Sequence, residues 1–176
     1  MVSKKFIFPF GMIALMICLG SCNSKNSLGT YKGTPYNDNF YNGSPQKIPG
    51  KLQAEYYDFG GEGVAFHDSD SVNSGSGGLN KADGSYLHAF RLNEAVDISF
   101  TKFQDPAVDN SPYNFAEPEK DQLYVGWTNA DEWTKYTIEV ETEGTYELGL
   151  MYTANQNGKI AFSVNDFDMT GPIEVP

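Results

Sequence analysis

Two tryptophans lie close together in residues 123–140, which read LYVGWTNADEWTKYTIEV. An indole ring at the edge of a loop can stack on a flat, partly apolar ligand face, such as one side of a sugar ring. Trp127 directly precedes a polar segment typical of a turn, residues 128–131, so its ring is predicted to lie at the edge of a sheet. Position alone leaves a ligand-stacking role and a core role equally open for Trp127. Trp133 lies inside a period-two run, and for this residue a core role is favoured.

Acidic residues in the same region are candidates for glycoside hydrolysis, which needs two carboxylates across a cleft, commonly ~5–9 Å apart. Surface charge is the favoured interpretation, because half of these residues fall on the solvent phase of the predicted strand. The sequence also has no nucleophile elbow and no two-histidine metal motif. We therefore expect a protein that is not an enzyme. The four acidic candidates are Asp131, Glu132, Glu139 and Glu141.

Two further local patterns are weak. Residues 68–73 resemble the start of a calcium loop, but position six is Asn73 rather than Gly and position twelve is Leu79 rather than Glu;. Residues 74–78 are rich in Gly and Ser, yet they neither follow a clear strand nor open a helix, which argues against a phosphate-binding loop. Neither pattern is taken as a site.

The tryptophans must be positioned by short strands, which alternating polar and apolar residues predict in several segments. Period-two alternation or extended character is found in residues 51–58, 64–67, 85–92, 95–100, 123–140, 145–153 and 159–165;. Residues 154–158, ANQNG, are typical of a hairpin turn that joins the last two runs. Residues 68–83 and 101–122 are predicted to be long loops, and no helical period of useful length is found. The pattern predicts an all-β fold, an antiparallel β-sandwich or jelly roll.

The N-terminus has the character of an export signal. Lys4 and Lys5 precede an apolar segment too short to span a bilayer comfortably, and small residues lead directly to Cys22;. This resembles a bacterial lipobox, which implies a signal peptide over residues 1–22 and lipid on Cys22. Residues 23–50 are predicted to be a tether, although their aromatic residues leave packing against the folded module open. We expect a cell-envelope lipoprotein, on the outer membrane of a Gram-negative bacterium, with the membrane face left open.

Composition excludes several classes of function. The chain has 12 Lys+Arg and 23 Asp+Glu, a formal net charge of −11, and no basic face suited to a polyanion;. Nucleic acid is therefore not an expected partner. Cys18 and Cys22 are the two cysteines, and both belong to the export signal, so the remaining chain has no thiol for a disulfide, a metal site or a nucleophile;.

Five motifs in order resemble carbohydrate-binding modules of family six. They are IPGKLQAEYYD at 48–58, GGEGVAFHD at 60–68, EAVDI at 94–98, YVGWT with EWTKYT at 124–137, and GTYEL at 144–148. The resemblance implies a jelly roll over residues 51–176 that binds polysaccharide in a loop cleft, as a monomer. It places Trp127 as one wall of the sugar site, with hydrogen bonds from His67, Asp68 and Asn129. It also implies a structural calcium ion held by Gln53 and Glu55, two residues apart and so on one face of a predicted strand.

The resemblance also implies a second clamp tryptophan and a late asparagine, but residues 171–176, GPIEVP, end the chain just short of where those elements should begin. No tryptophan follows Trp133. We therefore expect a truncated module with weak or no binding, either by itself or as the front of a longer glycan-degrading enzyme. An envelope scaffold that binds a protein partner is the alternative function, and a hydrolase in its own right is the less favoured one. The glycan cannot be identified from the sequence.

Overall fold

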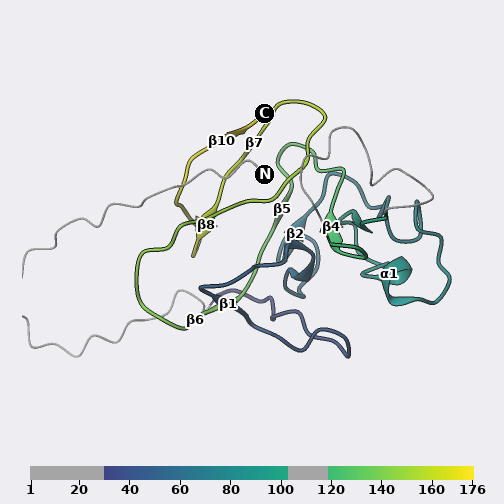
Figure 1. Ribbon diagram of the computed structural model, residues 1–176, viewed down its shortest axis with the longest axis horizontal. Coiled ribbons are helices and arrows are strands. Elements are labelled where there is room, and N and C mark those ends of the chain that lie inside the picture. Colours follow the sequence, from purple (N-terminus) through teal and green to yellow (C-terminus); the bar gives the residue numbers. More distant parts are fainter. Residues whose placement is uncertain (1–29, 103–118) are drawn as a thin grey trace, which may run out of the picture. The chain divides into compact units, whose positions relative to one another are not determined.

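A computed structural model describes residues 30–102 and 119–176, which fall into two compact units. The larger unit is Lys32–Glu143, and the smaller unit joins Gly144–Pro176 to the described residues Thr30 and Tyr31. The elements follow one another along the colour ramp in Figure 1. Among the described residues, regular structure consists mainly of strands of two or three residues, and helix is limited to α1 (Tyr86–Ala89) and the 3₁₀ turn η2 (Ala54–Tyr56). The predicted all-β character is confirmed.

Three strand pairs build the larger unit. β2 (Phe66–His67) pairs antiparallel with β5 (Trp133–Thr134), and the two lie side by side in Figure 1. β3 (Ile98–Phe100) pairs antiparallel with β4 (Leu123–Val125). β1 (Gln46–Ile48) pairs with β6 (Ile138–Val140) in parallel, which the antiparallel prediction did not include.

The predicted strand over residues 51–58 is wrong. Gln53 is extended, and the chain then turns through η2. The Gln46 side chain accepts from the Gln53 amide at 2.7 Å and donates to its carbonyl at 3.1 Å. The Arg91 guanidinium donates to the carbonyls of Tyr57 and Asp58 at 2.8 and 3.0 Å. These side chains satisfy backbone groups that a neighbouring strand would otherwise pair, so no ladder forms here.

Residues 85–92 also differ from the predicted extended run, because they contain α1. Ser85 is its N-cap residue and accepts from the Ala89 amide at 3.1 Å, which closes the single turn. A four-residue helix is too short to give a detectable 3.6-residue period in the sequence. Phe90 follows the helix and is buried in the core.

The segment predicted to be a tether joins the folded part from Lys32 onward. Thr34 exchanges two backbone hydrogen bonds with Phe59, at 2.8 and 2.7 Å, and Tyr36 is only 7% exposed. The Tyr41 ring stacks on Tyr56 with centroids 3.9 Å apart. Tyr36 and Tyr41 of this segment therefore pack against the module, the alternative that its composition had left open.

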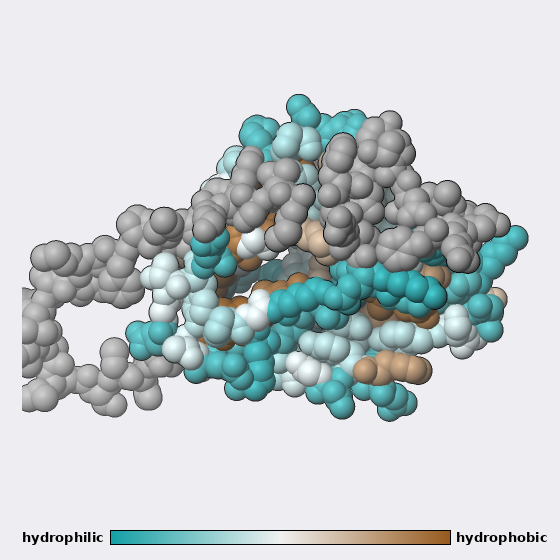
Figure 2. Space-filling model, in the orientation of Figure 1, coloured by the Kyte–Doolittle hydropathy of each residue, from teal (hydrophilic) through white to brown (hydrophobic). Residues whose placement is uncertain are grey.

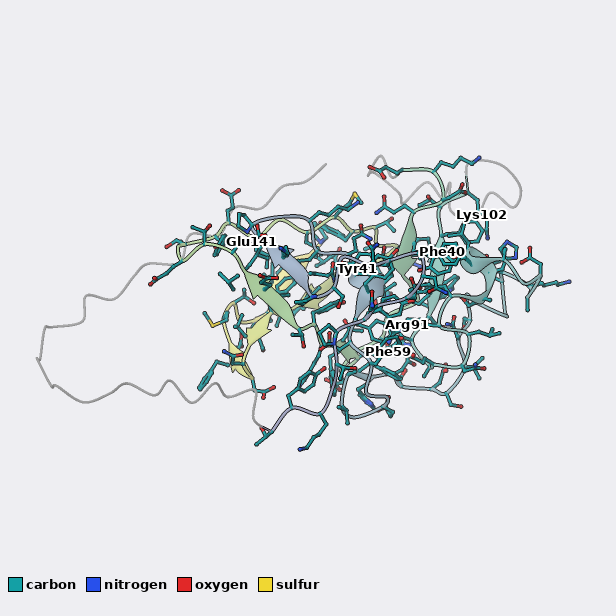
Figure 3. The ribbon with its side chains drawn as sticks, turned by 90° about the horizontal axis from the view of Figure 1, so that it is seen from below. Phe40, Tyr41, Phe59, Arg91, Lys102 and Glu141 are labelled. Carbon is teal, nitrogen blue, oxygen red and sulfur yellow. The ribbon has the colours of Figure 1, made fainter. Side chains whose placement is uncertain are left out.

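Aromatic and aliphatic side chains form the core of the larger unit. The Arg91 guanidinium lies within it, 3.4 Å from the Tyr57 ring centroid and 5.2 Å from that of Phe59 (Figure 3). On the face seen in Figure 2, the described residues present mainly hydrophilic surface with separate apolar patches. The buried hydrophobic residues are Tyr36, Tyr57, Ala65, Phe66, Phe90, Val96, Ile98, Phe100 and Leu123.

The smaller unit has two strand pairs. β7 (Gly158–Ile160) pairs antiparallel with β10 (Ile173–Val175), and β8 (Ser163–Val164) pairs antiparallel with β9 (Phe167–Asp168). The predicted strand over residues 145–153 and its hairpin at 154–158 are wrong, because the structure has no strand in 145–153. The observed hairpin turns at Asn165 and Asp166, whose φ values of 53° and 64° suit a two-residue turn;.

Candidate functional site

The β2–β5 pair separates a buried face from an exposed one. Phe66 lies opposite Thr134 and is 3% exposed, whereas His67 lies opposite Trp133 on the other face. Directly opposed residues of an antiparallel pair share a face. The His67 and Trp133 rings accordingly lie near each other, with centroids 6.4 Å apart. The candidate site includes the exposed face of this strand pair, which carries His67 and Trp133.

The prediction of a core role for Trp133 is wrong. Trp133 is 36% exposed, and the Lys135 ammonium lies 5.3 Å from its ring centroid. The period-two run in residues 133–140 is divided because the Asp58 carboxylate accepts from the Thr137 amide and hydroxyl, at 2.8 and 2.6 Å. β5 is therefore a two-residue strand whose one paired neighbour among the described strands is β2.

Trp127 lies at the end of β4 with an unusual backbone. Its φ is 47°, in the left-handed region that residues other than glycine rarely adopt, and its side chain is 45% exposed;. The amide of Gly126 donates to the Asp97 carbonyl at 2.9 Å, and Asn129 Nδ2 donates to the Trp127 carbonyl at 3.4 Å. The indole is thus exposed at the edge of the strand pair, as the ligand-stacking prediction requires.

Glu132 joins the two loops beside Trp127. Its Oε1 accepts from the Ser69 amide at 3.1 Å, the Ser69 hydroxyl at 2.6 Å and Asn129 Nδ2 at 3.2 Å. Its Oε2 accepts from the Asn129 amide at 2.7 Å. Burial alone would raise the pKa of Glu132, but these hydrogen bonds outweigh it and lower the pKa below its usual value;. The carboxylate is therefore held in its charged form.

His67 pairs with a carboxylate on its own side of the site. Its Nδ1 lies 2.5 Å from Glu62 Oε1, and Glu62 Oε2 accepts from the Asp68 amide at 3.1 Å. The hydrogen bond to Glu62 raises the pKa of His67, and the same bond lowers the pKa of Glu62. Burial, followed by repulsion from neighbouring carboxylates, raises the pKa of Asp68. On this side of the site, the ionisable ring of His67 therefore lies beside the carboxylate oxygens of Glu62.

Three of the four acidic residues considered for glycoside hydrolysis form hydrogen bonds or ion pairs with other residues of the chain. Both oxygens of Glu132 accept hydrogen bonds, and Asp131 is an exposed turn residue with φ 70°. Glu139 and Glu141 lie 3.7 and 2.8 Å from the Lys47 ammonium on the β1–β6 pair. Glu132 thus serves as a hydrogen-bond acceptor, and Glu139 and Glu141 are surface ion-pair partners of Lys47.

The two residues predicted to hold calcium lie together, although not on a strand. Glu55 is 5% exposed, and Gln53 Nε2 donates to Glu55 Oε1 at 3.2 Å. Burial raises the pKa of Glu55 to about 7. Rotation of the Gln53 amide would turn its oxygen toward the same point, giving two of the oxygen donors that Ca²⁺ prefers. A buried carboxylate beside an amide fits such a cation, with backbone carbonyls needed to complete the shell.

The structure brings four of the predicted residues into one region: Trp127, His67, Asp68 and Asn129 are joined through Glu132, Ser69 and Glu62. Ser69 and Glu62 were not among the predicted site residues, and Glu132 was considered only as a candidate catalytic acid. The predicted lipid site at Cys22 lies outside the described residues. Within residues 30–102 and 119–176, no helix has the length and apolarity needed to cross a bilayer.

Comparison of the chain with models of known protein families and with curated proteins finds no match. The likeness to family-six modules therefore stays a prediction from the motifs quoted above.

Proposed function

We propose that this protein is a non-catalytic carbohydrate-binding module whose ligand is a polysaccharide or oligosaccharide. One observation carries the proposal: the indole of Trp127 is 45% exposed on a backbone with φ 47°. Backbone strain of this kind costs of order 1–3 kcal/mol and often marks a functional position. An exposed ring held at a strained position is well suited to stack on a sugar face.

The neighbours of Trp127 supply the polar half of such a site. His67, Asp68 and Asn129 carry donors and acceptors able to bind sugar hydroxyls, and Trp133 adds a second exposed ring. A single stacking ring, as expected from the sequence, would give little affinity for a sugar. Stacking of a nucleic-acid base on an aromatic ring, a comparable contact, is worth only ~1–3 kcal/mol. A second exposed ring in the same region favours binding by this chain.

The proposal extends to architecture and location. The antiparallel pairs β2–β5 and β3–β4 are compatible with a jelly-roll sandwich, and the buried Gln53–Glu55 pair is compatible with a structural calcium ion. A lipid on Cys22 would attach the module to the bacterial outer membrane. The protein would then hold a polysaccharide at the cell envelope.

Affinity gel electrophoresis tests the proposal with xylan, laminarin, agarose and cellulose in separate gels. The wild type should be retarded by at least one polysaccharide, and Trp127→Ala should lose roughly 5- to 150-fold in affinity, the equivalent of ~1–3 kcal/mol. Phe40→Ala is the matched control, since Phe40 is an aromatic residue of the same unit that is 75% exposed (Figure 3). Equal mobility of wild type and Trp127→Ala in every gel would refute the proposal.

A further inference from the structure

Glu132 occupies a special place in the candidate site because it contacts both loops that border Trp127. Three donors reach its Oε1 and one reaches its Oε2, from Ser69 on one loop and Asn129 on the other. Hydrogen bonds to an ionised acceptor are about twice as strong as neutral ones. Glu132 therefore holds the two loops together more firmly than a neutral side chain would.

The connection from Glu132 to Trp127 is short. Asn129 is fixed through its amide at 2.7 Å and through Nδ2 at 3.2 Å, and the same Nδ2 reaches the Trp127 carbonyl at 3.4 Å. Asn129 Nδ2 also donates to the Ser69 hydroxyl at 3.3 Å. A single residue, Thr128, thus separates the anchored Asn129 from a tryptophan whose backbone would otherwise relax from φ 47°;.

We infer that Glu132 is a positioning residue that holds the Trp127 indole in its ligand-stacking orientation, with no contact of its own to the glycan. The inference rests on the proposed function. An ordered platform binds more tightly than a mobile one because less conformational entropy is lost on binding. The carboxylate thus acts on affinity through Asn129 and the turn at residues 127–131.

The first test observes Trp127 without ligand. Protein labelled with 5-fluorotryptophan gives two ¹⁹F signals, which a Trp127→Phe variant assigns. In Glu132→Ala, the Trp127 signal should narrow and move toward the position of a solvent-exposed, mobile indole. Glu132→Gln keeps one of the two acceptor oxygens and should give an intermediate signal. Urea unfolding of each variant shows whether the fold is retained.

The second test measures polysaccharide retention with the same proteins. Glu132→Ala should bind roughly tenfold more weakly than wild type, which corresponds to about 1.4 kcal/mol. Glu141→Ala is the matched control, because it removes an exposed carboxylate of the same unit that pairs with Lys47 at 2.8 Å (Figure 3). It should leave both the ¹⁹F signal and retention unchanged.

The outcomes separate this inference from the proposed function. Retention of the wild type, loss with Trp127→Ala and an unchanged Glu132→Ala would overturn the inference alone. A changed Trp127 signal with unchanged affinity would overturn it as well. No retention of the wild type by any polysaccharide would overturn the proposed function and the inference with it. If Glu132→Ala unfolds, Glu132→Gln and Ser69→Ala, which remove fewer contacts, decide the question.

Discussion

At the scale of single residues, the candidate site combines exposed aromatic rings with carboxylates that have defined partners. Glu62 accepts from the Asp68 amide and lies 2.5 Å from His67 Nδ1, while Glu132 accepts from Ser69 and Asn129. Both carboxylates have a lowered pKa. They are thus anionic near neutral pH and act as fixed acceptors, which orients the donors around Trp127.

His67 gives a pH-dependent prediction. Its hydrogen bond to Glu62 raises the folded-state pKa above 6.5, so the His67–Glu62 ion pair stabilises the fold below pH 6.5;. That stabilisation is lost as the pH rises through the raised pKa. An NMR titration of the His67 ring should therefore give a midpoint above 6.5, and Glu62→Gln should lower it. The same midpoint in both proteins would contradict the assignment.

The sequence predicted the residues with visible side-chain chemistry and missed those that act through hydrogen bonds. Trp127 was placed at a sheet edge from the polar segment that follows it, and its exposure agrees with this. Glu132 looked only like one acid among several, because its role depends on Ser69, 63 residues away along the chain. No local spacing reports such a contact. Trp133 was predicted to be core because a period-two run does not reveal whether a second sheet covers it.

At the scale of elements, hydrogen bonds from side chains to the backbone take the place of strand pairing in several segments that were predicted to be strands. Asp58 divides the run 133–140 through Thr137, and Arg91 takes the carbonyls that a strand at residues 51–58 would have paired. Strands β2, β3 and β4 lie within the predicted runs 64–67, 95–100 and 123–140, although the last run is divided into β4, β5 and β6. Strands paired mainly by backbone were therefore predictable, whereas segments fixed by distant polar side chains were not.

The loop before β3 gives a stability prediction. Asn73 Oδ1 accepts from the amides of Gly75, Ser76 and Ile98 at 2.9 to 3.2 Å, which draws the loop onto β3. A Cβ at Gly75 would lie 1.9 Å from the Ile98 carbonyl oxygen, so the backbone must move. Gly75→Ala should lower the free energy of unfolding by about 1–3 kcal/mol in urea.

Gly144→Ala is the control for that change, because a Cβ there meets no heavy atom within 4 Å. It should alter the unfolding free energy by less than about 0.5 kcal/mol, as surface substitutions usually do. Equal unfolding free energies for the Gly75 and Gly144 variants would show that the loop does not pack on β3 as described.

At the scale of the whole molecule, the larger unit carries every described residue of the candidate site. The chain has a formal net charge of −11, which suits a neutral polymer better than a polyanion;. The all-β character could be predicted from the alternating runs. The pairing of β7 with β10 could not, because the paired residues, such as Ile160 and Ile173, are 13 to 17 positions apart and share no turn signal.

Removal of calcium should affect the stability of the whole chain if Gln53 and Glu55 bind the ion. Calcium at 100 times its dissociation constant would add about 2.7 kcal/mol to the unfolding free energy. The Tm should therefore rise by several degrees over the value in chelator. Glu55→Gln should abolish the rise. An equal rise in the variant, or none in the wild type, would contradict this ligand assignment.

The central claim is that the Trp127 indole stacks on a saccharide, and NMR observation of the indole N–H signals tests it most directly. The chain has two tryptophans, so a ¹⁵N-labelled sample gives two such signals, which Trp127→Phe assigns. During titration with an oligosaccharide of a retained polysaccharide, the Trp127 signal should move and saturate at the dissociation constant measured by retention. Saturable binding that leaves the Trp127 signal in place, or no binding by any oligosaccharide, would contradict the claim.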